Sequence, residues 1–149
     1  MFPWLHYSCP VEKIEASLIV DAIKEAELNT SAEIRVHYTT KKSKNLLLEE
    51  AQQTFEALKM HETALRNGIL IYLRLKNKEI AILGDIGIHQ HVGNEFWEAV
   101  KEEIISTIQA SNITQGIIKG IELSGKQLSI HFPPNGLNPN ELSDEITHD

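Results

Sequence analysis

The sequence contains a single cysteine, Cys9, among 149 residues. One cysteine cannot form a disulfide within the chain, so nothing in the sequence demands an oxidising compartment. No apolar run approaches the ~20 residues that a membrane-spanning helix needs. The first ten residues have neither a basic segment nor a continuous apolar one, and so do not resemble a secretory signal. These absences predict a soluble, cytoplasmic protein.

Positive charge is also scarce, because acidic side chains outnumber basic ones and give a net charge of −7. This charge argues against nucleic acid or an anionic membrane as a partner, and it is compatible with cations as ligands. The sequence has no Walker A motif, no dinucleotide-binding glycine pattern, no nucleophile elbow and no Cys/His pair at a supporting spacing. The enzyme classes that depend on these motifs are therefore not indicated.

The most informative stretch is residues 66–92. It holds two apolar runs, residues 69–73 and 80–83, which are separated by a polar break around Asn77. The first run is rich in β-branched and aromatic residues, which favours buried strands joined as a hairpin, although a short buried helix has the same pattern. The second run ends in the glycine-flanked segment 84–87. We expect this hairpin to be the centre of a sheet.

Other segments have apolar residues at the spacing of a strand or of a helix. Residues 32–38 alternate strictly, with Ile34, Val36 and Tyr38 on one face and ionisable residues on the other, which predicts a half-buried strand. Four further segments have the spacing of amphipathic helices. Their predicted starts are Pro10, Asn45, the residues after Gly87, and Asn112 or Thr114.

The order of these elements predicts an α/β fold, a three-layer α/β/α sandwich in which a small mixed sheet carries helices on both faces. Gly116, Gly120 and Ser124 recur every four residues, so we expect the last helix to approach the sheet closely. The length is that of one domain, which we place at residues 1–132. Residues 133–149 are polar and predict a disordered tail. The strand order does not follow from the sequence.

Asp85 is the first candidate for a functional residue, because it stands where the second apolar run ends. It can bond the backbone N–H groups of a tight corner in which the glycines supply backbone freedom. Alternatively, it can provide a hard oxygen ligand for Ca²⁺ or Mg²⁺. Glu33, on the ionisable face of its strand, is the best-placed partner; its alternative role is a surface ion pair with Arg35 or a lysine.

Histidines near Asp85 suggest a second type of site. His89 and His91 could bind zinc or nickel, but two histidines at this spacing share a face only in an extended segment, and no third ligand is evident. Exposed polar histidines near a helix start are the alternative interpretation. His61 and Glu62, in the connection before the hairpin, are further candidates for the surroundings of Asp85.

Several motifs, in this order, resemble the TPM domain, a family named after thylakoid-lumen and photosystem-repair proteins. The resemblance runs from about Pro10 to Phe132 and is greatest to the small stand-alone bacterial members. The motifs are residues 30–36, residues 66–72, residues 82–88, the helix with Phe96 and Trp97, and the helix with Gly116 and Gly120.

The resemblance implies an α/β/α sandwich that binds a divalent cation at the edge of the sheet and, for plant members, an acid phosphatase activity. Position by position, it implies Glu33, Asn67 and Asp85 as the metal-binding residues. The sequence departs from the family pattern at two of the motifs. Ala32 stands where the family often has glycine, and the glutamate that follows the glycine turn in plant members is missing here.

Two functional hypotheses follow. In the first, a soluble TPM-domain protein binds Ca²⁺ or Mg²⁺ in an acidic pocket near Asp85 and Glu33. In a phosphatase version of it, the metal neutralises phosphate charge and positions water. In the second, the chain is a non-catalytic binding or adaptor module, in which the metal only stabilises loops and a protein partner docks on the tail or on an acidic face.

Overall fold

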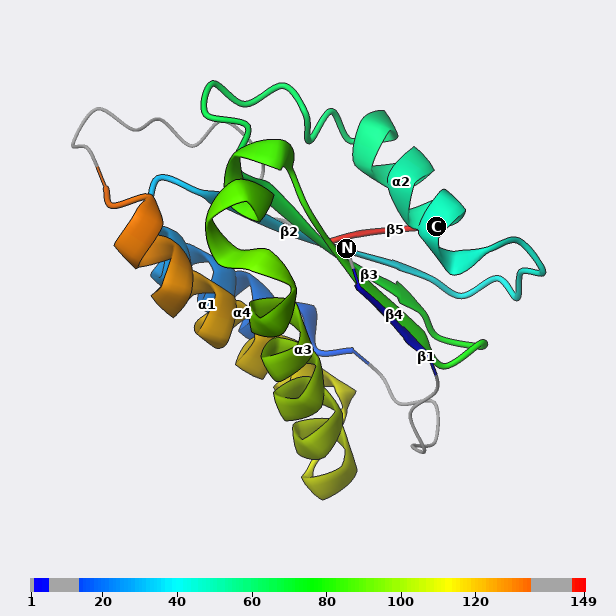
Figure 1. Ribbon diagram of the computed structural model, residues 1–149. Coiled ribbons are helices and arrows are strands. Elements are labelled where there is room, and N and C mark those ends of the chain that lie inside the picture. Colours follow the sequence, from blue (N-terminus) through cyan, green and yellow to red (C-terminus); the bar gives the residue numbers. More distant parts are fainter. Residues whose placement is uncertain (1, 6–13, 135–145) are drawn as a thin grey trace.

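The structure is a computed structural model that describes residues 2–5, 14–134 and 146–149. In Figure 1, α2 covers one face of a sheet while α1, α3 and α4 cover the other, so the predicted three-layer α/β/α sandwich is confirmed. The elements are β1 (Phe2–Leu5), α1 (Ala16–Glu27), β2 (Glu33–Thr39), α2 (Leu47–Ala57), β3 (Gly68–Arg74), β4 (Glu79–Gly84), α3 (Ile86–Ala110), α4 (Ile113–His131) and β5 (Thr147–His148).

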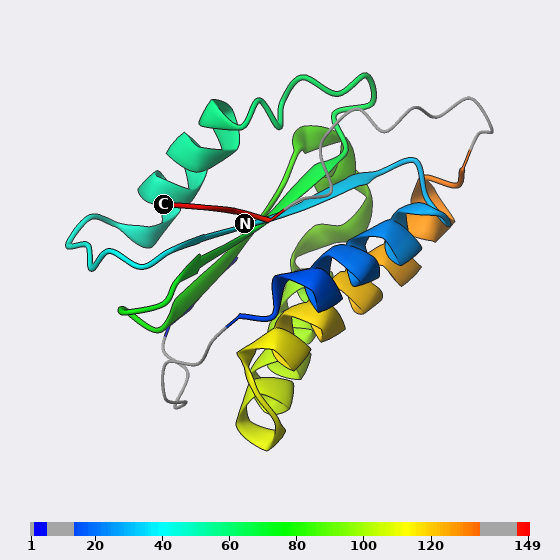
Figure 2. The same ribbon diagram turned by 180° about the vertical axis from the view of Figure 1, so that it is seen from behind.

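The sheet is mixed and has the strand order β1-β4-β3-β2-β5. The predicted hairpin is confirmed as the antiparallel pair β3 and β4, and β2 lies parallel to β3. The sequence does not predict β1 and β5, which cover the two edges of the sheet and are seen from behind in Figure 2. β5 lies within the segment 133–149, so the predicted disorder does not extend to its two residues. Residues 135–145 and the helix start at Pro10 lie outside the described residues.

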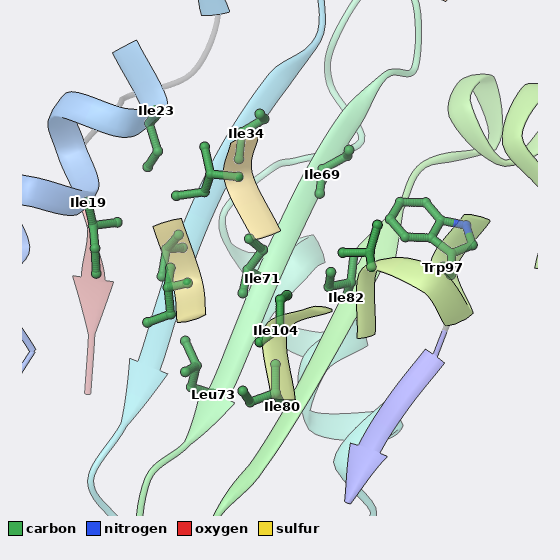
Figure 3. Packing of buried hydrophobic residues seen from close by; sticks show 14 of the residues in the cluster. Ile19, Ile23, Ile34, Ile69, Ile71, Leu73, Ile80, Ile82, Trp97 and Ile104 are labelled. Atoms are coloured by element: carbon green, nitrogen blue, oxygen red, sulfur yellow. The ribbon is translucent and has the colours of Figure 1, made fainter. Parts of the chain in front are cut away.

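β3 is buried on both faces, which explains why its sequence is apolar without alternation. Ile69, Ile71 and Leu73 belong to the larger cluster, beneath α1, α3 and α4, while Leu70 and Tyr72 belong to the cluster under α2. Figure 3 shows the larger cluster, which spans β2, β3 and β4 and also includes Trp97 of α3. The central strand is thus fixed from both sides, and its ends can position loops.

α3 is bent at Gly93, where φ is +67°. A glycine adopts this left-handed conformation without the steric cost that a Cβ would add. The helix therefore consists of a short first segment, which starts directly after Asp85, and a longer second segment. Among the described helices, none combines the length and the apolar composition needed to cross a bilayer.

Gly116 and Gly120 of α4 face α3, not mainly the sheet as predicted. A Cβ on Gly116 would lie 2.3 Å from a side-chain carbon of Ile108, and a Cβ on Gly120 would lie 2.4 Å from one of Ile104. The nearest sheet atom to the Gly120 position, on Ile71, is 4.0 Å away. The helical period identifies the apolar face of α4 correctly but does not say which neighbour covers it.

Candidate functional site

Two of the predicted site residues lie at one end of the sheet, on either side of the start of β3. Glu33 of β2 is in register with Gly68, and its N–H donates to the Asn67 carbonyl at 3.3 Å. On the other side, the N–H of Asp85 donates to the Gly68 carbonyl at 2.9 Å. The parallel pairing of β2 with β3 and the antiparallel β3–β4 hairpin together bring residues 33 and 85 to the same end of the sheet.

Asp85 is the N-cap of α3, and Arg66 pairs with its carboxylate. Asp85 Oδ1 accepts at 2.8 Å from the N–H of Ile86, the first residue of the helix, whereas N-cap side chains usually accept from the second or third. The Arg66 guanidinium donates twice, from Nε to Oδ2 at 2.6 Å and from Nη2 to Oδ1 at 2.8 Å. The hydrogen bond to Asp85 raises the pKa of Arg66 further above its usual value. Both of the sequence-derived roles for Asp85 therefore remain open, because the residue caps the corner and also presents a charged carboxylate.

The loop before β3 is docked on the first turn of α3. The Gly87 N–H donates to the Arg66 carbonyl at 2.9 Å, and Arg66 itself has φ of +51°. A Cβ on Gly87 would lie 2.2 Å from the Leu65 carbonyl oxygen and 2.6 Å from that of Arg66. Gly84 is similarly close to Trp97, where a Cβ would lie 2.9 Å from Cζ2. Close approach, and not the backbone freedom expected from the sequence, explains these two glycines.

Asp85 opens on a cleft of about 490 Å³ between α2 and the end of β4. The Asp85 side chain is only 5% exposed, whereas that of Arg66 is 44% exposed. The cleft has apolar walls, formed in part by Phe55, Leu83 and Ile86, and its polar lining residues are Gln52, Glu56, His61, Arg66 and Asp85. A larger hollow of about 560 Å³ lies between α1 and α4, but the acidic and basic side chains along it are all exposed. The cleft is therefore the better candidate, because it combines a buried charge with access from solvent.

Glu33 and Asn67 do not line this cleft. Both are 1% exposed, and the buried side chain of Met60 lies over Gly68, with Cε 3.3 Å from the position of a Cβ there. Asn67 Nδ2 donates to the Ser31 carbonyl at 3.2 Å, and its Oδ1 is buried with no hydrogen-bond partner among the described residues. The structure thus brings all three predicted ligands to one end of the sheet, but only Asp85 lines the cleft. Nowhere in the described chain do three or more His, Cys, Asp or Glu side chains gather closely enough to hold a metal.

The histidines near Asp85 do not form a metal site of their own. His89 and His91 are exposed and helical, so the two side chains point to different sides of α3. His91 stacks on His131, with ring centroids 5.2 Å apart. His61 does line the cleft, as the sequence suggested, and its Nε2 lies 4.0 Å from Glu62 Oε1.

Arg66 is the main residue of this site that sequence reasoning misses. The signal was present in the hairpin, because the pairing of Ile69 with Gly84 carries Arg66 to the level of Gly87 and hence beside Asp85. Using that signal requires the register, which only the folded sheet provides.

The fold and the site together define a class of protein. It is a three-layer α/β/α protein with one buried acid at an open cleft. The TPM domain matches residues 12–127, and the chain belongs to this family. The chain is also similar to the BA42 protein of the psychrophilic bacterium Bizionia argentinensis, known from an NMR structure. The two share 38% identity over 93% of this chain and 97% of the other, with a TM-score of 0.85.

A second NMR structure, the N-terminal domain of a protein from P. gingivalis, is similar in fold alone. It has 14% identity, covers 77% of this chain and 75% of its own, and gives a TM-score of 0.59. A comparison with curated proteins finds no match.

Proposed function

We propose that this TPM-domain protein binds a divalent cation, Ca²⁺ or Mg²⁺, at the Asp85 cleft. The observation that carries the proposal is a carboxylate that is 5% exposed and nevertheless lines a cleft open to solvent. Carboxylate oxygen is the ligand type that both ions prefer. A buried acid is costly unless a cation compensates it; Arg66 does so here, and a divalent ion in the cleft would take over that role.

Other oxygen atoms of the cleft fit such an ion. Gln52 and Glu56 lie one helical turn apart on α2, and Gln52 Nε2 donates to Glu56 Oε1 at 3.2 Å. This bond leaves the Gln52 carbonyl oxygen and the second Glu56 oxygen for other ligands. Glu33 and Asn67 stay predicted ligands from the sequence; neither lines the cleft, so the ion proposed here would be held by Asp85 and the two α2 side chains. Water would complete the coordination shell.

The proposal is tested by thermal unfolding with and without millimolar Ca²⁺ or Mg²⁺. An ion at about 100 times its Kd stabilises the folded state by about 2.7 kcal/mol, which raises Tm by about 5–10 °C in a chain of this size. Asp85→Asn should abolish most of the shift. The control is Asp21→Asn, which removes an exposed charge on α1 and should leave the shift intact. A wild-type shift of zero with both ions rejects the site.

A phosphatase version needs more than the cation. The cleft lining in the described chain holds no serine, threonine or cysteine, so attack would fall to water, with Glu56 or His61 as its base. This favours the second candidate, a binding module without turnover. Hydrolysis of p-nitrophenyl phosphate with and without EDTA separates the two. A metal-dependent rate that Asp85→Asn removes would establish the enzyme; a rate no higher than that of denatured protein would leave the binding module.

A further inference from the structure

The protein itself supplies a positive charge to the Asp85 carboxylate, the guanidinium of Arg66. Arg66 meets Asp85 as a two-pronged partner, at 2.6 and 2.8 Å, in the geometry that gives guanidinium–carboxylate pairs their strength. These two bonds use both carboxylate oxygens, and Oδ1 also accepts from Ile86 N–H. A metal ion that binds both oxygens of this carboxylate would have to displace the guanidinium.

We propose that Arg66 is an exchangeable counter-ion: it orients the Asp85 carboxylate in the cation-free protein, and the incoming cation displaces it. This inference rests on the proposed cation site and adds a positioning residue to it. Arg66 then sets the affinity of the site, since each binding event must first break the ion pair.

The two partners differ in their freedom to move. Asp85 is 5% exposed and is fixed by its place between β4 and α3. The backbone of Arg66 is also fixed, because its carbonyl accepts from Gly87 and its N–H donates to Thr63 at 3.2 Å. The Arg66 side chain is 44% exposed, and within the described residues the hydrogen bonds of its guanidinium go to Asp85 alone. The guanidinium is therefore the only part of the pair that can leave without disturbing the fold.

The displacement of Arg66 should be favourable for divalent ions and not for monovalent ones. Replacing a single positive charge by a divalent ion increases the attraction to Asp85, whereas Na⁺ or K⁺ would offer no gain in charge over the arginine. The internal counter-ion therefore discriminates against monovalent ions, which are the more abundant competitors in any buffer. Removing it should strengthen cation binding, since the ion no longer has to break an existing pair.

The test is a Ca²⁺ titration, followed by amide chemical shifts, of wild type, Arg66→Gln, Arg66→Lys and Lys59→Gln. Arg66→Gln should lower the half-saturating concentration by roughly three- to tenfold. Arg66→Lys, which keeps the charge but not the two-pronged geometry, should fall between Arg66→Gln and wild type. Lys59→Gln is the matched control: it removes an exposed charge in the nearby loop with no contact to Asp85, and should leave the titration unchanged.

A second measurement on the wild-type protein does not depend on a variant that folds. The Nε–H signal of Arg66 should shift and exchange faster as Ca²⁺ saturates the site, because it loses its acceptor. Binding by wild type with an unchanged Nε–H signal, or equal or weaker binding by Arg66→Gln, overturns the counter-ion role and leaves the cation site standing. Binding by Arg66→Gln alone supports the role in its strongest form. Absence of binding in both proteins rejects the cation site itself.

Discussion

Two arginines lie on the α2 face of the sheet, at opposite ends of β3, and each pairs with carboxylates. Arg74 is sealed: its side chain is 4% exposed, and it donates to Glu79 Oε1 at 2.7 Å, to Glu50 Oε2 at 3.3 Å and to the Asn45 carbonyl at 2.7 Å. Arg66 is open and serves one acid. Arginine–carboxylate pairing thus joins β3, β4 and the start of α2 at the Arg74 end of β3. At the Arg66 end, the same kind of pair has a partner that is proposed to be replaceable.

The two arginines differ in solvent access, since the Arg74 side chain is 4% exposed and that of Arg66 is 44% exposed. The acids around Arg74 are themselves held by other groups. Glu50 accepts from Ser43, from Tyr72 and from Arg74. Burial would raise the pKa of Glu50, but these hydrogen bonds outweigh it and bring the pKa below its usual value. Burial, followed by the charge of Glu50, raises the pKa of Tyr72. Glu50 and Tyr72 also line a hollow of about 330 Å³, whereas Arg74 and Glu79 are not part of its lining.

The largest expected effect is that of Arg74→Gln. It leaves the buried Glu79 and the half-buried Glu50 without their cation, and breaking a buried pair costs about 3–5 kcal/mol. Urea unfolding measures the loss, with Lys44→Gln on the surface as the charge-matched control. A loss below about 1 kcal/mol would mean that water enters the cluster freely, and the comparison between sealed and open ends would fail.

Gly87→Ala should act on the open end by displacing the loop that carries Arg66. The new Cβ meets two carbonyl oxygens closer than any real contact, and crowding of this kind costs about 1–3 kcal/mol. We expect a lower urea midpoint together with an altered Ca²⁺ affinity. Gly93→Ala is the control in the same helix: there the added Cβ has open space but a left-handed φ, so stability should fall while cation affinity stays the same.

The sealed end should also govern stability in acid. The folded pKa of Glu50 lies below its ordinary value of 4.5, so its contribution to stability is present above pH 4.5 and is lost as the pH falls through the folded pKa. Unfolding in urea at a series of pH values from 6 to 3 should show this fall, and Glu50→Gln should flatten it. An equal slope in the variant would assign the acid sensitivity to other carboxyl groups.

The smallest effect on stability is expected for Arg66→Gln without added metal. The pair is half-open to solvent, so its loss should lower Tm by no more than a few degrees. Together, the two substitutions should distinguish the two ends of β3. Arg74→Gln should change stability and not cation affinity, whereas Arg66→Gln should change cation affinity and not stability. A large fall in Tm for Arg66→Gln would show that the open pair is structural as well.

Most of the fold follows from the sequence because it depends on local periodicity. The apolar run of residues 69–73 and the alternation of residues 32–38 predict buried strands, which the structure has as β3 and β2. β5 could not be predicted, because its two residues pair with His37 and Tyr38, which are more than one hundred positions away. Sequence period says little about contacts over such separations.

The sequence likewise predicts some residues of the site and misses others. Asp85 stands out because a glycine-flanked acid follows an apolar run. Its partner Arg66 depends on the hairpin register and on a loop held in a left-handed conformation, neither of which a pattern of residue types reveals. Glu33 follows from the alternation of its strand, but the side chain that separates it from the cleft, Met60, belongs to an irregular connection with no period at all.

The two outermost strands give the sheet a particular vulnerability. β1 has four residues and β5 has two, yet they alone cap the exposed hydrogen-bonding rows of β4 and β2. A protease that trimmed either segment would leave the core intact and turn it into a template on which other polypeptides could add strands. Whether this molecule resists fibril growth thus depends on half a dozen residues at the two edges of its sheet.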